Sequence, residues 1–202
     1  MRLTVRRMFG LDRSGPEPPQ TRKGMPLRPF TIPNAVGYVR LALIPVFLWL
    51  AFDSADGRGP AIATIFALIS FGDYVDGFLA RLTGQYSRLG ALMDPVIDRL
   101  TILSGVVVCW EFDLLPRLAL AVLAARELVT LLIAQWGLRH GVDVAVNWPG
   151  RIAVFPIMGA IAVALALETP VAAIALWAGI ALAILATVLY ARAGLVAARQ
   201  RA

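Results

Sequence analysis

The sequence predicts an all-α integral membrane protein with six transmembrane helices and both termini in the cytoplasm. Of its 202 residues, 59% are hydrophobic, whereas a soluble domain has about 45–50% apolar residues. The mean hydropathy is +0.74. The apolar residues gather in stretches close to the length of about 20 residues that a helix needs to cross a bilayer. Short loops separate these stretches.

The six apolar stretches define the expected organisation of the chain. They run over residues 34–52, 60–80, 90–110, 117–137, 151–167 and 170–190. We therefore predict one membrane domain over residues 31–192. A basic, Pro-rich cytoplasmic segment precedes it at residues 1–30, and a basic cytoplasmic tail follows it at residues 193–202.

The distribution of charge predicts the orientation. The net charge is +6, and residues 1–30 hold seven basic residues against two acidic ones. Arginines also flank the loops after the second and fourth spans and fill the C-terminal tail: Arg81, Arg88, Arg139, Arg151, Arg192, Arg199 and Arg201. By the positive-inside rule, these segments are cytoplasmic. The basic N-terminal segment is expected to contact anionic lipid and not nucleic acid, since no nucleic-acid-binding motif accompanies it.

Two residues that often carry chemistry are given structural interpretations. Cys109 is the only cysteine, so it cannot form an internal disulfide, and no thiol chemistry is expected. His140 is the only histidine and lies in a polar loop beside Arg139, where a solvated side chain is the simpler interpretation.

Four aspartates lie inside or at the edge of the second and third spans: Asp73, Asp76, Asp94 and Asp98. Each costs about 2.5–3.5 kcal/mol to insert at the centre of a bilayer, so a functional site is the default interpretation. Positions 73, 76, 77 and 80 share one helical face, and positions 90, 94 and 98 share another. Because a short loop joins these two helices, we expect antiparallel neighbours with both acidic faces at matching depth, in the cytoplasmic half of the membrane.

The aspartates require positive charge nearby, because closely spaced carboxylates would otherwise take up protons. Hard divalent cations with oxygen ligands are the natural partners, and the helix beginning near residues 87–90 offers an N-terminus for an anion. One alternative is a salt-bridge network, with Arg81 holding Asp73 and Asp76 and Arg99 holding Asp98. It does not account for four aspartates on facing stripes beside glycines. A cation or proton relay is a second alternative.

These residues carry a family resemblance. The pattern Asp73-x-x-Asp76-Gly77-x-x-Ala80-Arg81, eight residues, Gly90-x-x-x-Asp94-x-x-x-Asp98 matches the signature of the CDP-alcohol phosphotransferase family (CDP-alcohol phosphatidyltransferases) at every position. The start of the first span, Thr31-Ile-Pro33-Asn34 with Arg40 six residues on, is also similar to this family.

The resemblance implies an enzyme of phospholipid biosynthesis. Such an enzyme moves a phosphatidyl group from CDP-diacylglycerol to an alcohol and releases CMP, usually with two Mg²⁺ or Mn²⁺ ions per active site. It implies that Asp73, Asp76 and Asp94 hold the metals, and that Asp98 contributes to the metal site and acts as general base. It further implies that Asp73, Gly77, Ala80, Arg81 and Gly90 bind the CDP group. A homodimer in the cell inner (plasma) membrane, with its active site facing the cytoplasm, is also expected.

The alcohol acceptor stays open between two glycerol compounds. Arg126, Arg139 and Arg151 are candidates for binding an acceptor phosphate. The pair Arg126-Glu127 and the turn before Arg151 resemble phosphatidylglycerophosphate synthases, which use glycerol 3-phosphate. However, Ala153 and Ala134 stand where those enzymes carry further basic residues. Residues 87–100 resemble actinobacterial cardiolipin synthases, whose acceptor is phosphatidylglycerol. Inositol phosphate is an alternative acceptor, and a membrane cation or proton transporter is the alternative of a different class.

Overall fold

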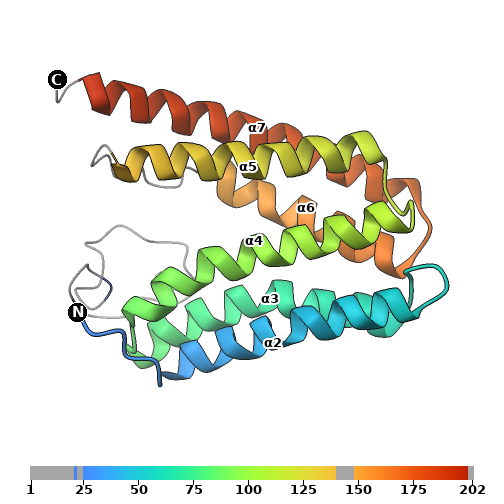
Figure 1. Cartoon of the computed structure of the whole chain (residues 1–202), viewed down its shortest axis with the longest axis horizontal. Helices are drawn as coiled ribbons and strands as arrows, with labels where there is room; N and C mark the ends of the chain where they lie inside the picture. Colours follow the sequence, from blue (N-terminus) through green and yellow to red (C-terminus); the bar gives the residue numbers. More distant parts are fainter. Residues whose placement is uncertain (1–20, 22–24, 140–147, 200–202) are drawn as a thin grey trace. The chain divides into compact units, whose positions relative to one another are not determined.

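The computed structural model describes residues 21, 25–139 and 148–199, which form six long α-helices and no strand (Figure 1). This confirms the all-α prediction for the described part of the chain. The helices are α2 (Ile32–Asp53), α3 (Pro60–Thr83), α4 (Arg88–Glu111), α5 (Arg117–Arg139), α6 (Trp148–Ala166) and α7 (Pro170–Arg199). The largest departure from the predicted spans is at the end of α7, which continues to Arg199 where residue 190 was expected.

Three helical segments in the described residues are long and apolar enough to cross a membrane, as expected of a membrane protein. They are Ile32–Asp53, Pro60–Thr83 and Pro170–Leu189, and a shorter apolar helix covers Ile152–Ala166. The remaining helices, α4 and α5, carry charges along their length, such as Asp94 and Asp98 in α4 and Glu127 in α5. The prediction of six membrane spans with cytoplasmic termini stays a prediction.

The helices belong to two compact units. Unit 1 comprises the chain up to Leu50 together with Thr64–Ser104, and unit 2 comprises Ala51–Ala63 together with Gly105–Ala202. Unit 1 therefore holds most of α2 and α3 and the first part of α4. The rings of Phe47 and Phe66 lie 5.3 Å apart and are fully buried, as are Ile69 and Ile97. These buried side chains of α2, α3 and α4 belong to the core of the unit that holds the aspartates.

Proline fixes where two helices begin and interrupts the hydrogen bonding of others. Pro60 and Pro170 are the first residues of α3 and α7, a position where proline's missing N–H costs nothing. Pro45, Pro95 and Pro156 lie inside α2, α4 and α6, where each removes one helical hydrogen bond. Pro95 follows Asp94 directly, so α4 lacks a regular backbone bond beside one of the aspartates.

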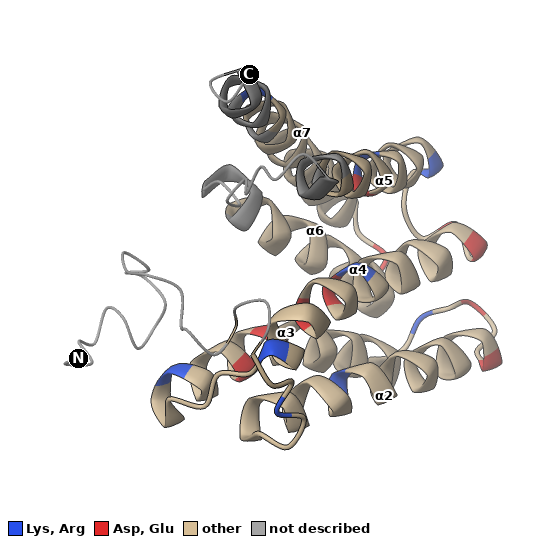
Figure 2. Cartoon of the chain, turned by 60° about the vertical axis from the view of Figure 1, so that its left-hand side comes forward, with Lys and Arg blue, Asp and Glu red and all other residues tan. Residues whose placement is uncertain are grey.

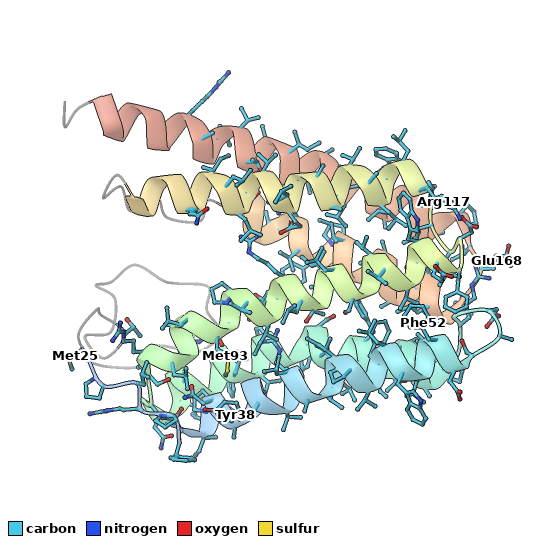
Figure 3. All side chains as sticks on the ribbon, in the orientation of Figure 1. Met25, Tyr38, Phe52, Met93, Arg117 and Glu168 are labelled. Atoms are coloured by element: carbon cyan, nitrogen blue, oxygen red, sulfur yellow. The ribbon has the colours of Figure 1, made fainter. Side chains whose placement is uncertain are left out.

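Unit 2 is built on α7, against which both α5 and α6 pack. Its core consists of buried aliphatic side chains: Leu120, Leu123, Ile157, Ile161, Leu165, Leu176 and Ile180. The loop before α3 closes onto the end of α6, because Gly59 N donates to Leu165 O at 3.0 Å and Arg58 Nε donates to Ala164 O at 3.2 Å. Figure 3 labels Phe52, Arg117 and Glu168 near the helix-connecting loops of this unit.

The packing of α6 against α7 generates a prediction about Gly179. A Cβ at Gly179 would lie 2.7 Å from Ile157 Cγ1 and 3.0 Å from Ile157 N, whereas a Cβ at Gly159 would meet nothing within 4 Å. Gly179→Ala is therefore expected to lower the free energy of unfolding by about 1–3 kcal/mol. Gly159→Ala should leave it unchanged or raise it by up to about 1 kcal/mol, because alanine favours the helix. Unfolding of both proteins in detergent measures the difference, and equal effects would contradict the close packing.

Candidate active site

The two acidic stripes predicted from the sequence lie on α3 and α4, inside unit 1. Asp73 and Asp76 belong to α3, and Asp94 and Asp98 belong to the first half of α4. Figure 2 shows acidic segments on α3 and α4 and a basic segment on α2. Asp76 is buried, with 5% of its surface exposed, whereas the side chains of Asp73 and Asp98 are 51% and 41% exposed. The stripe therefore combines a buried carboxylate with accessible ones.

The side chain of Arg40, from α2, lies among these carboxylates. Its Nη1 atom is 2.9 Å from Asp76 Oδ2 and 3.6 Å from Asp73 Oδ1, and its Nη2 atom is 2.6 Å from Asp98 Oδ1. Its Nε donates to the backbone carbonyl of Ile69 at 3.0 Å. Arg40 is only 2% exposed. One guanidinium thus joins α2, α3 and α4.

Arg40 is part of the family resemblance, but the sequence did not predict that it pairs with the aspartates. The salt-bridge alternative considered Arg81 and Arg99 as partners, because both are close in sequence to the aspartates. Asp76 and Asp98 each form an ion pair with Arg40, which lies 36 and 58 positions away in the sequence. A signal was present, since Arg40 is an ionisable residue in the middle of an apolar span, and such residues have a functional interpretation by default.

A cavity of about 170 Å³ lies beside the aspartates in unit 1. It is lined by every residue predicted to contact the CDP group except Asp73, namely Gly77, Ala80, Arg81 and Gly90, together with Asp76 and Asp94. Other lining residues come from the start of α2 and the loop before α4: Pro33, Asn34, Gln85, Tyr86 and Ser87. The structure therefore gathers the predicted residues around one cavity.

Asn34 and Ser87 form the buried wall of this cavity. Ser87 Oγ donates to Asn34 Oδ1 at 2.8 Å and accepts from Gly90 N at 2.9 Å, which caps α4. Asn34 Nδ2 donates to the carbonyls of Arg28 and Pro29, both at 3.0 Å. The network ties the chain before α2 to the start of α4, near Met25, Tyr38 and Met93 in Figure 3.

The Asn34–Ser87 network leaves no room for a side chain at Gly90. A Cβ there would lie 2.7 Å from Asn34 Oδ1 and 3.1 Å from Ser87 Oγ. The backbone amides at the start of α4 are also engaged: Leu89 N donates to Leu27 O at 3.1 Å, and Ala91 N donates to Ser87 O at 3.3 Å. The expectation that this helix N-terminus receives an anion is therefore not supported by these amides.

The sequence profile of the CDP-alcohol phosphatidyltransferases matches residues 30–185. The chain belongs to this family. A Streptomyces coelicolor protein named cardiolipin synthase (CMP-forming) is 41% identical over 136 residues, which cover 65% of this chain and 63% of that protein. The chain thus spans less than two thirds of the length of that relative.

A second relative carries the other acceptor in its name. The Escherichia coli K12 protein named CDP-diacylglycerol–glycerol-3-phosphate 3-phosphatidyltransferase is 33% identical over 127 residues. These cover 61% of this chain and 70% of that protein. Membership of the CDP-alcohol phosphatidyltransferase family confirms the resemblance that the aspartate signature carried.

The donor chemistry of the family signature suits a hard divalent cation, because the aspartates offer oxygen ligands and two of them, Asp76 and Asp94, line one cavity. As the side chains stand, no group of three Asp, Glu, His or Cys residues within the described ranges could hold a metal ion. Three of the four aspartates face Arg40 instead. The assignment of metal ligands to Asp73, Asp76, Asp94 and Asp98 stays a prediction.

The candidate acceptor residues belong to unit 2. Arg126 forms an ion pair with Glu127, which is only 4% exposed, and its Nε donates to Thr187 Oγ1 at 3.2 Å. Thr130 Oγ1 lies 3.4 Å from Thr187 Oγ1 and extends this polar cluster between α5 and α7. Arg139 and Arg151 lie in α5 and α6, and their side chains, like His140, are outside the described residues. Their roles in the family reaction are untested.

The cavity wall generates a second prediction. Gly90→Ala should push Asn34 and Ser87 apart and lower the free energy of unfolding by about 1–3 kcal/mol. Gly77→Ala is the matched control, because a Cβ at Gly77 would meet only the flexible end of Arg81, at 3.4 Å. Denaturant unfolding of the two purified variants measures the difference. A Gly90→Ala protein as stable as Gly77→Ala would contradict the role given to the Asn34 network.

Proposed function

We propose that this protein transfers the phosphatidyl group of CDP-diacylglycerol to a hydroxyl of phosphatidylglycerol, giving cardiolipin and CMP. The observation that carries the proposal is that Asp76, Asp94 and the family's small residues line one cavity in unit 1. The name of the Streptomyces coelicolor relative supports this choice of acceptor. The activity is assigned to unit 1 because all eight signature residues belong to it.

The cavity would hold the CDP group of the donor lipid. Arg81 lines it and can pair with a phosphate through two N–H groups. Gly77 and Ala80 present no side chain or a small one, which lets a ligand approach the backbone of α3. Gly90 also lines the cavity, and its missing side chain leaves room for Asn34 and Ser87. Asp73, Asp76 and Asp94, with a contribution from Asp98, would hold two Mg²⁺ or Mn²⁺ ions. When bound, such ions neutralise the pyrophosphate and stabilise the departing CMP.

Asp98 would act as the general base of the transfer. The acceptor oxygen attacks the phosphorus that carries diacylglycerol, the new P–O bond forms, and the P–O bond to CMP breaks. The hydroxyl proton passes to the Asp98 carboxylate. Because Arg40 engages Oδ1 of Asp98 at 2.6 Å, Oδ2 is the oxygen that would take the proton. The 41% exposure of this side chain leaves it accessible to an acceptor.

The surroundings of Arg126 favour a lipid acceptor over glycerol 3-phosphate. Glycerol 3-phosphate carries a terminal phosphate with close to two negative charges, and such a group calls for uncompensated basic side chains. Arg126 is already neutralised by the buried Glu127. Glycerol 3-phosphate is the second candidate, supported by the name of the Escherichia coli relative. Arg126, Arg139 and Arg151 stay candidate acceptor residues.

The placement in the membrane completes the proposal. All six helices would cross the inner (plasma) membrane, with both termini and the cavity end of unit 1 at the cytoplasmic side. The basic residues at 1–30 and in the tail support this orientation. CMP would then leave into the cytoplasm while both lipid substrates stay in the bilayer. A homodimer is proposed as the working form, from the family resemblance alone.

The base role of Asp98 is tested by Asp98→Asn. This change is expected to slow CMP release by a factor of about 10²–10⁴, the usual contribution of a positioned acid or base. Purified protein is supplied with CDP-diacylglycerol, phosphatidylglycerol and Mg²⁺, and CMP is quantified. Asp53→Asn, at an exposed position in unit 2, should retain wild-type activity, and EDTA should stop the wild-type reaction. Undiminished activity of Asp98→Asn would rule out the assigned base.

The acceptor is tested by offering phosphatidylglycerol and glycerol 3-phosphate separately and identifying the lipid product. Phosphatidylglycerol is expected to give cardiolipin at a rate at least tenfold higher than the rate with glycerol 3-phosphate. The opposite ratio, with phosphatidylglycerophosphate as product, would replace the first acceptor by the second. No metal-dependent CMP from either acceptor, combined with cation flux into liposomes that Asp76→Asn abolishes, would favour the transporter alternative.

A further inference from the structure

Arg40 lies in a buried position whose surroundings are complementary to its side chain. All three of its guanidinium nitrogens are engaged, by Ile69 O, Asp76 and Asp98. Its aliphatic stem crosses Gly72 of α3, where a Cβ would lie 2.7 Å from both Cγ and Cδ of Arg40. The side chain is 2% exposed. Any other residue at position 72 would displace it, so the absence of a side chain there is what admits the arginine.

The guanidinium compensates only part of the local negative charge. Four aspartates carry a formal charge of −4, while Arg40 and Arg81 carry +1 each, which leaves −2 before any ligand arrives. Arg40 also uses a single oxygen of each close partner, Oδ2 of Asp76 and Oδ1 of Asp98. The second oxygen of Asp76 is left for another cation, whereas the second oxygen of Asp98 is the one proposed to take the acceptor proton. The arrangement can therefore hold the arginine and further positive charge together.

We propose that Arg40 is a permanent internal counter-cation that assembles the aspartates in the metal-free protein, and that it stays in place when a divalent cation binds. This rests on the proposed function only in taking a divalent cation as the ligand of the cluster. Without Arg40, the buried carboxylate of Asp76 would be left uncompensated, which is strongly destabilising. With Arg40, the cluster stays assembled, but its affinity for a metal ion is lower than it would be without the arginine, because a positive charge lies within it.

Arg40 is also a positioning residue for the reaction. By bridging Asp76 on α3 and Asp98 on α4 it fixes the separation of a proposed metal ligand and the proposed base. Lysine keeps the charge, but its single ammonium group cannot reproduce the planar fork that reaches two carboxylates and a carbonyl. Arg40→Lys is therefore expected to lower kcat about tenfold or more while leaving the KM for CDP-diacylglycerol within a factor of about two.

The decisive experiment compares thermal unfolding of the full-length protein in EDTA and in excess Mn²⁺, with Mn²⁺ affinity measured by titration calorimetry. Arg40→Met should lower the Tm in EDTA by several degrees, and Mn²⁺ should recover most of that loss. Its Mn²⁺ Kd should fall about tenfold below the wild-type value. Arg40→Lys should lie between the two proteins. Mn²⁺ binding is read without catalysis, so an inactive protein can still support or overturn the proposal.

Arg58→Met is the matched control. Like Arg40, Arg58 donates through Nε to a backbone carbonyl and pairs with a carboxylate, that of Glu168 at 3.6 Å, but it belongs to unit 2. It should lower the Tm equally in EDTA and in Mn²⁺. The same equal loss in Arg40→Met, with unchanged Mn²⁺ affinity, would reduce Arg40 to a packing residue and overturn the proposal. Absence of Mn²⁺ binding to the wild type would overturn it as well.

Gly72→Ala keeps the test informative if Arg40→Met does not fold. This variant retains every charge and displaces Arg40 only through the added Cβ. It should show the same larger recovery of Tm by Mn²⁺, and recovery no larger than in the wild type would contradict the proposal. If the Mn²⁺ pattern appears but the wild type releases no CMP, then the role of Arg40 stands and the proposed transferase activity falls.

Discussion

Aspartates placed within apolar helices stay charged only if a cation balances them, and in unit 1 the chain supplies one from within, the guanidinium of Arg40. Much of the unit follows from this pairing. The Arg40 side chain requires a residue without a Cβ at position 72. It holds Asp76 and Asp98 close to α2 and donates a hydrogen bond to the Ile69 carbonyl of α3. Polar contacts thereby hold α2, α3 and α4 together in a region where apolar packing alone has little specificity.

A second network fixes the other side of the cavity, and its character differs. Asn34, Ser87 and Gly90 are joined by neutral hydrogen bonds in which donors and acceptors are matched. They determine where α4 begins relative to α2, and therefore where Asp94 falls along the cavity wall. The charged network sets the separation of the carboxylates, whereas the neutral network sets the opening beside them. Both networks meet at α4, where Asp98 belongs to the charged network and Gly90 to the neutral one.

The sequence predicted the helices and the aspartate faces because both depend on periodicity along a single segment. Asp73, Asp76, Asp94 and Asp98 follow helical spacing, and the short loop between α3 and α4 leaves few ways to arrange them. The partner of these aspartates could not be found in that way, since Arg40 lies 36 residues before Asp76 and no periodicity links them. Asn34 was noted only by resemblance, and its partner Ser87 lies 53 residues away in the sequence. Pairing between distant segments leaves no local pattern from which it could be predicted.

The balance of charge connects these networks to the proposed chemistry. In unit 2, the charges of Arg126 and Glu127 cancel each other, so this pair needs no additional ion. In unit 1, four aspartates with Arg40 and Arg81 sum to a formal charge of −2, and the two phosphates of CDP-diacylglycerol would add −2. An anionic substrate would thus enter an already negative site, which is unfavourable at low dielectric. Two divalent cations bring the sum to zero. The excess of carboxylate over arginine therefore supports the proposal that two metal ions take part in the reaction.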